Sequence, residues 1–247
     1  TLDTAILYGD SEFFLGQIGV DDFNIITKLP AMPKGQVDAY SWVRLQVKKS
    51  LNRLCVKSLY GLLLHRSDQL LGPNADELYR GLQSLKDDGL VCKVGISIYS
   101  SNELVKTVSN YKLDLVQAPF NLIDRDLHTS GWMRRLKKLG IEIHTRSTFL
   151  QGLLLMDPVE IPSKFLAWSE LFQQWHQWVE SCGCSKLEAC VAFTLQYPEI
   201  DQVVVGVNSA GQLRQIIRTI EHMSISNFPD IQKSDQNLIN PSNWINL

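Results

Sequence analysis

Four residues in the first third of the chain have side chains that can hold or move a proton: Asp3, Tyr8, Lys28 and His65. A free tyrosine has a pKa of about 10, so it donates a proton poorly at neutral pH. A nearby ammonium stabilises the tyrosinate and lowers that pKa, and Lys28 is the candidate for this task. Asp3 would pair with Lys28 and offset its buried charge. His65 would donate a hydrogen bond to the oxygen that receives the proton.

Each of these residues also has an ordinary interpretation. Tyr8 beside a glycine could pack in a loop, and Asp3 could be a turn residue. Lys28 could be a solvated charge, and His65 could be a hydrogen-bonded core histidine. We favour the catalytic interpretation because the ordinary one requires four coincidences at consecutive strand ends, where α/β barrels place their active sites.

Apolar, β-rich runs alternate with helical segments along the chain. Val43, Val47 and Leu51 lie on one face of a predicted helix over residues 37–54. Asn74 followed by Glu77 resembles a capping box before a second helix. Further helices are predicted from residue 101 and over residues 132–139, 187–195 and 212–220. The predicted strands are residues 2–5, 23–29, 59–64, 91–98, 113–117, 141–145 and 202–207.

This alternation predicts an α/β fold with a parallel sheet. The strands are continuous apolar runs, which indicates that both faces of the sheet are buried. A doubly wound sheet and a closed barrel both fit the pattern. A barrel needs eight strands, and an eighth upstream of Thr1 would complete it. We expect one barrel domain over residues 1–220 and a C-terminal tail, residues 221–247, that packs on it.

Composition excludes several classes of function. The formal net charge of −2 gives no reason to expect nucleic acid or a membrane surface as a partner. The five cysteines form no disulfide framework or zinc pattern, so we expect reduced thiols, no metal site and a cytoplasmic location. A barrel hydrolase would need paired carboxylates or metal ligands at strand ends, where only Asp3 supplies a carboxylate.

The segment LDTAILYGDSE, from Leu2 to Glu12, resembles the signature of the aldo-keto reductases. The run that ends at Lys28 resembles the family's third strand, and the run that ends at His65 resembles its fourth. The similarity extends to about residue 220 and lacks the family's first strand and helix. It implies a (β/α)8 TIM barrel, here without its first strand–helix unit.

The resemblance also implies a function. Such an enzyme reduces the carbonyl of an aldehyde, ketone or sugar by hydride transfer from NADPH or NADH, or catalyses the reverse oxidation, with Tyr8 as the proton donor. The alternative is a non-catalytic module on the same fold that senses nicotinamide nucleotides or binds a partner. The complete set of four residues favours the enzyme. The physiological substrate and the oligomeric state are not predicted.

The cofactor-binding residues are likewise implied by the resemblance, because no GxGxxG motif follows a strand. Ser97 and Gln117 match residues that hold the nicotinamide carboxamide. Arg146 stands where the family usually carries an aromatic residue stacked on the nicotinamide. Residues 206–213 contain no Lys or Arg, which gives little electrostatic support for NADP over NAD. The other implied contacts are Ser147, Phe149, Gln151, Gly206, Asn208 and Gln212.

Overall fold

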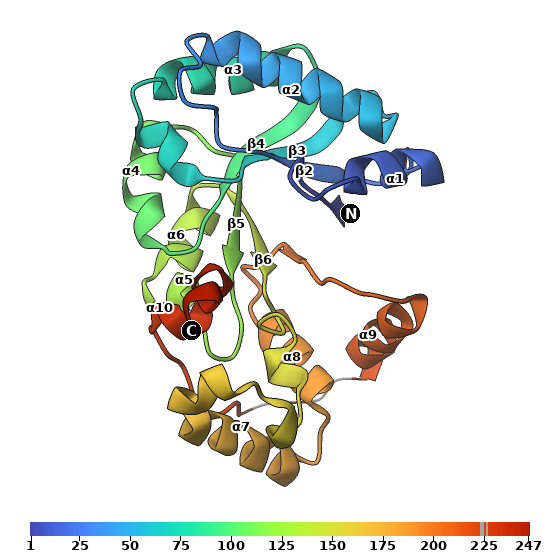
Figure 1. The fold of residues 1–247 in the computed structure, drawn as a ribbon, viewed down its shortest axis with the longest axis vertical. Coiled ribbons are helices and arrows are strands. Elements are labelled where there is room, and N and C mark those ends of the chain that lie inside the picture. Colours follow the sequence, from blue (N-terminus) through green and yellow to red (C-terminus); the bar gives the residue numbers. More distant parts are fainter. Residues whose placement is uncertain (223–224, 226) are drawn as a thin grey trace. The chain divides into compact units, whose positions relative to one another are not determined.

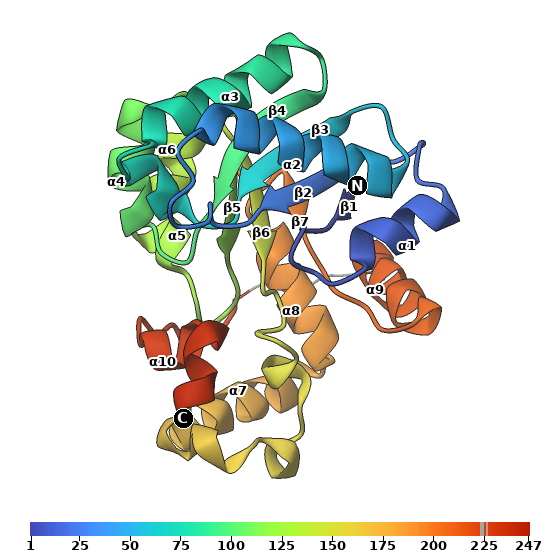
Figure 2. The ribbon, with the colours of Figure 1, turned by 45° about the horizontal axis from the view of Figure 1, so that its top comes forward.

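The computed structural model describes residues 1–222, 225 and 227–247. Within this described part, seven strands form one sheet, and each strand neighbours the next one along the chain (Figure 1 and Figure 2). Every strand pair with a defined register is parallel, which confirms the predicted sheet. The strands are β1 (Leu2–Asp3), β2 (Ile25–Leu29), β3 (Leu59–Leu64), β4 (Val91–Ser97), β5 (Leu115–Pro119), β6 (Glu142–Arg146) and β7 (Gln202–Val203).

Helices follow most of the strands, and the first one comes directly after β1. Parallel neighbours require such crossover connections, and helices usually provide them. The helices are α1 (Ser11–Ile18), α2 (Ala39–Leu54), α3 (Ala75–Asp87), α4 (Asn102–Asn110), α5 (Asp126–Thr129), α6 (Trp132–Lys138), α7 (Ser169–Cys182), α8 (Lys186–Leu195), α9 (Ala210–His222) and α10 (Gln236–Ile239). The 3-10 turns are Ser67–Leu71, Leu153–Leu155, Pro158–Glu160, Ser163–Trp168 and Pro241–Asn246.

The chain divides into two compact units. The first contains residues 1–117 and 136–143, and the second contains residues 118–135 and 144–247. Strands β1 to β4 and helices α1 to α4 belong to the first unit, whereas β7 and helices α7 to α10 belong to the second. Strands β5 and β6 each pass from one unit into the other.

The core of the first unit lies between its strands and helices. Ile26, Leu63 and Leu115 form a fully buried cluster on β2, β3 and β5. Helices α2 and α3 cover one face of these strands (Figure 1). A Cβ atom on Gly95 would lie 1.8 Å from the backbone oxygen of Leu115, so only glycine permits this approach of β4 to β5.

A late segment of the chain completes the first unit. The backbone N–H of Glu142 donates to the oxygen of Asp114 at 2.9 Å. Its carboxylate accepts a 2.7 Å hydrogen bond from the Tyr60 hydroxyl and lies 2.5 Å from the ammonium of Lys93. Residues 136–143 are therefore joined to strands β3 and β4 by backbone and side-chain contacts.

The predicted capping box at Asn74 is wrong, although α3 does begin at the next residue, Ala75. The side chain of Asn74 makes no capping hydrogen bond and instead donates to the backbone oxygen of Gln36 at 3.4 Å. The carboxylate of Glu77 accepts from the backbone N–H of Ala39 at 3.4 Å. Both side chains thus join α3 to the segment that leads into α2.

The second unit has its own aromatic core. Trp175 in α7 is fully buried, and its indole donates to the oxygen of Leu154 at 3.1 Å. Trp178 stacks on Trp175 with ring centroids 5.7 Å apart. Trp168 lies just before α7, and its indole donates to Asp235 at 3.1 Å. Trp175 and Trp178 therefore both lie in α7 and stack on each other, whereas Trp168 lies just outside the helix.

Candidate active site

A buried ion pair joins the carboxyl ends of β1 and β2. The ammonium of Lys28 lies 2.5 Å from Asp3 Oδ1, and it donates to the backbone oxygen of Thr4 at 3.0 Å. The Lys28 side chain is 1% exposed and that of Asp3 is 13% exposed. A buried ammonium is tolerated when a carboxylate and further hydrogen bonds satisfy it, and Lys28 has both kinds of partner.

Tyr8 lies beside this pair, in the connection between β1 and α1. The ammonium of Lys28 is 5.2 Å from the centroid of its ring. The ring of His65 meets it edge-on, with centroids 5.8 Å apart and an interplanar angle of 76°. The Tyr8 side chain is 48% exposed, so solvent and small molecules can reach it. The structure thus brings together the four residues that sequence analysis selected for catalysis.

Gln117 contacts the same cluster from β5. Its side-chain amide donates to Asp3 Oδ2 at 2.7 Å, while Asp3 Oδ1 is held by Lys28. Gln117 is 1% exposed, and its neighbour in register on β4, Ser97, is 5% exposed. The contact between Gln117 and Asp3 was not predicted, because nothing local in the sequence brings β5 to β1.

The predicted cofactor segment after β6 lies in the second unit and has an unusual backbone. Ser147, Leu150 and Gln151 adopt positive φ angles of 63°, 45° and 55°. Residues other than glycine and asparagine rarely adopt this left-handed conformation, and such backbone strain clusters at functional sites. The guanidinium of Arg146 donates to the Ser147 hydroxyl at 3.3 Å, and the Asn121 amide donates to the Ser147 oxygen at 3.0 Å. Phe149 is half-buried in the same loop.

A buried acid that sequence analysis did not select lies in the same unit. Asp124 is 1% exposed, and its Oδ2 has no hydrogen-bond partner among the described residues. Burial raises the pKa of Asp124 to about 7, although a hydrogen bond from the backbone of Asp126 and the charge of Arg146 act in the opposite direction. No sequence motif marks this residue, because its pKa depends on burial in the folded unit.

The last three predicted cofactor residues lie where α9 begins, also in the second unit. Gly206 and Asn208 are in the loop after β7, and Gln212 is in the first turn of the helix. The backbone N–H of Asn208 donates to the Gln212 side chain at 2.7 Å. The backbone N–H of Gln212 donates to the Ser209 hydroxyl at 3.2 Å. The side-chain oxygen of Gln212, on the helix, therefore binds a backbone N–H of the loop that precedes it.

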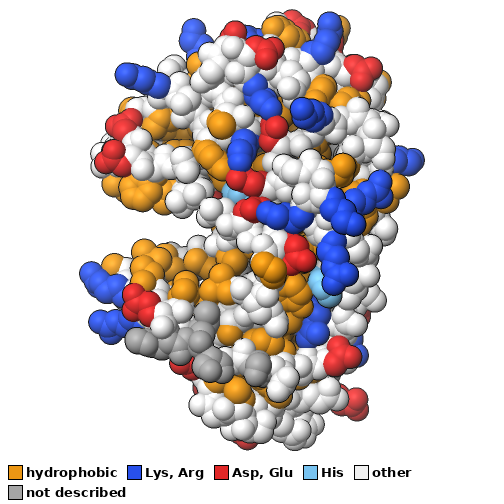
Figure 3. Space-filling model, turned by 180° about the vertical axis from the view of Figure 1, so that it is seen from behind, with side chains coloured by type: hydrophobic (Ala, Val, Ile, Leu, Met, Phe, Trp, Pro, Cys, Tyr) orange, Lys and Arg blue, Asp and Glu red, His pale blue; other side chains and the backbone are white. Residues whose placement is uncertain are grey.

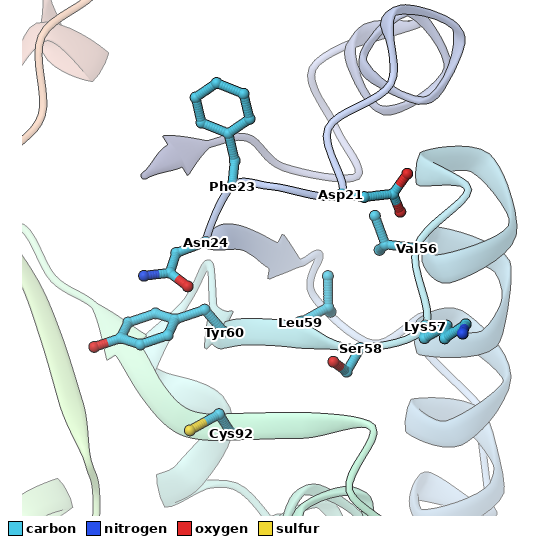
Figure 4. Close-up of a pocket in the computed structure, with 9 residues that line it drawn as sticks. All are labelled: Asp21, Phe23, Asn24, Val56, Lys57, Ser58, Leu59, Tyr60 and Cys92. Atoms are coloured by element: carbon cyan, nitrogen blue, oxygen red, sulfur yellow. The ribbon is translucent and has the colours of Figure 1, made fainter.

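A cavity of about 650 Å³ lies at the opposite ends of the strands of the first unit. Its side chains come from the segment before β2, the segment that leads into β3, and the start of β4 (Figure 4). It includes none of the predicted site residues, so we do not assign the chemistry to it. The lining residues are Asp21, Phe23, Asn24, Val56, Lys57, Ser58, Leu59, Tyr60 and Cys92.

Metal ligands, thiols and apolar helices are the remaining features of the described residues that bear on the kind of site. No group of three or more His, Cys, Asp or Glu side chains could hold a metal ion there. All five cysteines are free thiols. None of the described helices combines the length and apolar character needed to cross a membrane. On the face shown in Figure 3, basic and acidic side chains are mixed.

Parallel strands that follow one another in sequential order, with ionisable side chains gathered at their carboxyl ends, are typical of the class of α/β-barrel enzymes. The family model of the aldo/keto reductase family matches residues 1–236. The chain therefore belongs to the aldo/keto reductase family, and the predicted (β/α)8 fold, here with seven described strands, is confirmed.

Known proteins similar to this chain are oxidoreductases or aldo-keto reductases. An uncharacterized oxidoreductase of Bacillus subtilis, YqkF, is 26% identical over 237 residues, covering 88% of this chain and 76% of YqkF. The holo form of the aldo-keto reductase AKR11C1 from Bacillus halodurans has a TM-score of 0.74 at 21% identity, covering 91% of this chain and 78% of that chain. The glycerol dehydrogenase AKR11B4 from Gluconobacter oxydans has a TM-score of 0.70 at 22% identity, covering 91% and 76%. The chain is thus a carbonyl-reducing oxidoreductase in the general sense.

Proposed function

We propose that this protein reduces the carbonyl group of an aldehyde, ketone or sugar with NADPH or NADH, and that Tyr8 donates the proton to the carbonyl oxygen. The observation that carries this proposal is the position of Lys28. Its ammonium is 2.5 Å from Asp3 and 5.2 Å from the ring of Tyr8. A buried positive charge at that place favours the tyrosinate and so lowers the pKa of the phenol, which makes Tyr8 a better acid near neutral pH.

The other residues of the cluster have distinct tasks. Asp3 holds the Lys28 ammonium in place and neutralises its charge, so that the lysine is stable while buried. His65, with its ring 5.8 Å from that of Tyr8, is placed to donate a hydrogen bond to the same carbonyl oxygen. Because Tyr8 is half-exposed, the carbonyl can approach it from solvent.

The residues present fit a nicotinamide cofactor. Ser97 and Gln117 are neighbours in register, both are buried, and they offer the hydroxyl and amide groups that a carboxamide needs. When bound, the cofactor supplies the hydride.

The other cofactor contacts are those that the family resemblance implies. Arg146 would stack its guanidinium plane on the nicotinamide ring. Ser147, Phe149 and Gln151 would contact it from the same loop. Gly206, Asn208 and Gln212 would hold the adenosine end at the start of α9, where a helix N-terminus suits a phosphate.

Tyr8→Phe tests the proposal directly, with Tyr79→Phe as the matched control. Tyr79 lies on α3, and its hydroxyl donates to the backbone oxygen of Lys112 at 2.9 Å. We expect Tyr8→Phe to lower kcat for aldehyde reduction at least a hundredfold, in the range of a lost general acid. Cofactor affinity, measured by fluorescence titration, should stay nearly unchanged, and Tyr79→Phe should behave like the wild type.

Two other outcomes would overturn the proposal. Undiminished turnover in Tyr8→Phe would show that another group delivers the proton. Tight cofactor binding by the wild type without turnover of any aldehyde, ketone or sugar in a broad panel would instead support a non-catalytic module that senses the nucleotide.

A further inference from the structure

Helix α1 buries its acid and exposes its aromatic residues. Glu12 is 2% exposed, whereas Phe13 and Phe14 are 48% and 56% exposed. Glutamate is among the residues least often fully buried, and burial of a charge is costly unless the charge is paired. The position of Glu12 therefore requires specific partners.

Those partners come from two different elements. Oε1 of Glu12 accepts a 2.6 Å hydrogen bond from the hydroxyl of Thr27 on β2. Oε2 accepts from Arg53 Nε on α2 at 2.7 Å, and a second guanidinium nitrogen of Arg53 lies 2.5 Å from it. The Ser50 hydroxyl accepts from the same guanidinium at 3.2 Å. One carboxylate thus joins α1 to both β2 and α2.

The packing of α1 against α2 leaves little freedom around this contact. A Cβ atom on Gly16 would lie 2.1 Å from the backbone oxygen of Arg53, so the two helices approach to within backbone contact. Gly16 is four residues after Glu12 and therefore lies on the same face of α1. Docking and charge pairing occur on one face of the helix.

The place of Glu12 in the chain connects it to the catalytic cluster. Tyr8 precedes Glu12 by four residues, and the oxygen of Tyr8 accepts from the backbone N–H of Ser11 at 3.0 Å. Thr27 directly precedes Lys28 in β2. Successive strand residues point to opposite faces, so Glu12 holds β2 from the face opposite Lys28.

We propose that Glu12 is a positioning residue that fixes the connection carrying Tyr8 relative to Lys28. This inference rests on the proposed function, in which the ammonium of Lys28 lowers the pKa of Tyr8. Lys28 and His65 face Tyr8, and Asp3 lies behind Lys28. Arg53 faces Glu12, so the charge of Glu12 is balanced locally and acts on Tyr8 through position.

The test compares Glu12→Gln with Asp88→Asn. Asp88, at the end of α3, pairs at 2.6 Å with Arg44, which lies on α2 like Arg53. Its side chain is 48% exposed. Asp88→Asn therefore also removes a carboxylate from an arginine of α2. Ultraviolet difference titration of Tyr8, with Tyr8→Phe as the blank, reports the pKa of the phenol without any turnover. We expect Glu12→Gln to raise that pKa by about one, towards the ordinary value near 10.

Steady-state kinetics should change in parallel. Glu12→Gln should lower kcat roughly ten- to a hundredfold, as a misplaced catalytic group does, and should leave KM for the cofactor nearly unchanged. Asp88→Asn should change neither quantity. If Glu12→Gln does not fold, Thr27→Val removes the hydrogen bond from β2 and should shift the Tyr8 titration in the same direction.

The opposite result is a lowered melting temperature with an unchanged titration of Tyr8 and an unchanged pH profile of kcat. That outcome would overturn the inference and make Glu12 a purely structural residue. A third result would separate the two proposals. If Glu12→Gln shifts the titration of Tyr8 but Tyr8→Phe keeps full activity, the proposed function is overturned and the positioning role of Glu12 stays intact.

Discussion

The side-chain amide of Gln117 donates to Asp3 Oδ2 at 2.7 Å, although the two residues are 114 positions apart. The other oxygen of Asp3 is held by Lys28. Both oxygens of the carboxylate therefore have charge-assisted or amide partners, and the ion pair has a fixed orientation. This arrangement links the proposed proton donor to the proposed carboxamide site through one acid.

Asp3→Asn should destabilise the protein strongly. The variant leaves the 1% exposed ammonium of Lys28 without its carboxylate, and breaking a buried pair in this way costs about 3–5 kcal/mol. Asp68→Asn is the control, because the Asp68–Arg66 pair is more than half exposed and should contribute less than about 1 kcal/mol. Urea unfolding at neutral pH measures both, and equal losses would contradict the prediction.

Asp124 should make stability decrease as the pH rises. Its pKa in the folded protein is about 7, above the unfolded value of about 3.9, so the folded state keeps the proton longer. Stability is therefore greatest below pH ~4 for this group, falls between about 4 and 7, and then levels off. Asp124→Asn should remove this slope and stabilise the protein above pH 7 by at most about 4 kcal/mol. The measurement is the free energy of unfolding of both proteins from pH 5 to 8. If it changed with pH by the same amount in the wild type and in Asp124→Asn, this pKa would be wrong.

Two glycine substitutions should have opposite effects. Gly95→Ala places a Cβ 1.8 Å from the Leu115 oxygen, so strands β4 and β5 must separate, and we expect a loss of several kcal/mol or an insoluble protein. Gly211→Ala lies in α9 with 3.6 Å to the Ser209 hydroxyl, and should gain about 0.5–1 kcal/mol from helix propensity. Thermal denaturation of both variants is the measurement, and a well-folded Gly95→Ala protein would show that the sheet can relax.

The preference between NADP and NAD should be modest. Residues 206–213 contain no Lys or Arg, and Arg214 is the nearest cation in the sequence, exposed on α9. A single charge-assisted hydrogen bond to the 2′-phosphate contributes about 1.5–3 kcal/mol, or roughly ten- to a hundredfold in affinity. Arg214→Ala should reduce any NADP preference by that factor in cofactor titrations. A preference above about a thousandfold that survives the substitution would mean that the phosphate is bound elsewhere.

The positions of the strands could be predicted from the sequence more accurately than the local backbone conformation. All seven predicted runs contain an observed strand or overlap one, because continuous apolar runs between helices are a strong signal. Hydrophobic periodicity did not indicate helix α1, since its aromatic residues are exposed and its acid is buried, the reverse of the usual pattern. The left-handed residues Ser147, Leu150 and Gln151 were also unpredictable, because that conformation is normally marked by glycine or asparagine.

For the site, the Asp3–Lys28 pair was predicted, but the contacts made by residues distant in the sequence were not. Asp3, Lys28 and His65 were selected because each lies at the end of an apolar run, and the structure places them near Tyr8. The contacts of Gln117 and the burial of Asp124 depend on segments that are distant in the sequence. The roles of all these residues, and the division of the chain at residue 220, stay predictions.

The first unit is not contiguous in the chain, and this sets an order for its folding during synthesis. Glu142 supplies the carboxylate for Tyr60 and Lys93, yet residues 118–135 of the second unit precede it. A ribosome-bound chain that ends before residue 136 carries strands β1 to β4 without that carboxylate. The proposed catalytic cluster of Asp3, Tyr8, Lys28 and His65 is encoded first, but the unit around it can close only after part of the second unit has left the ribosome.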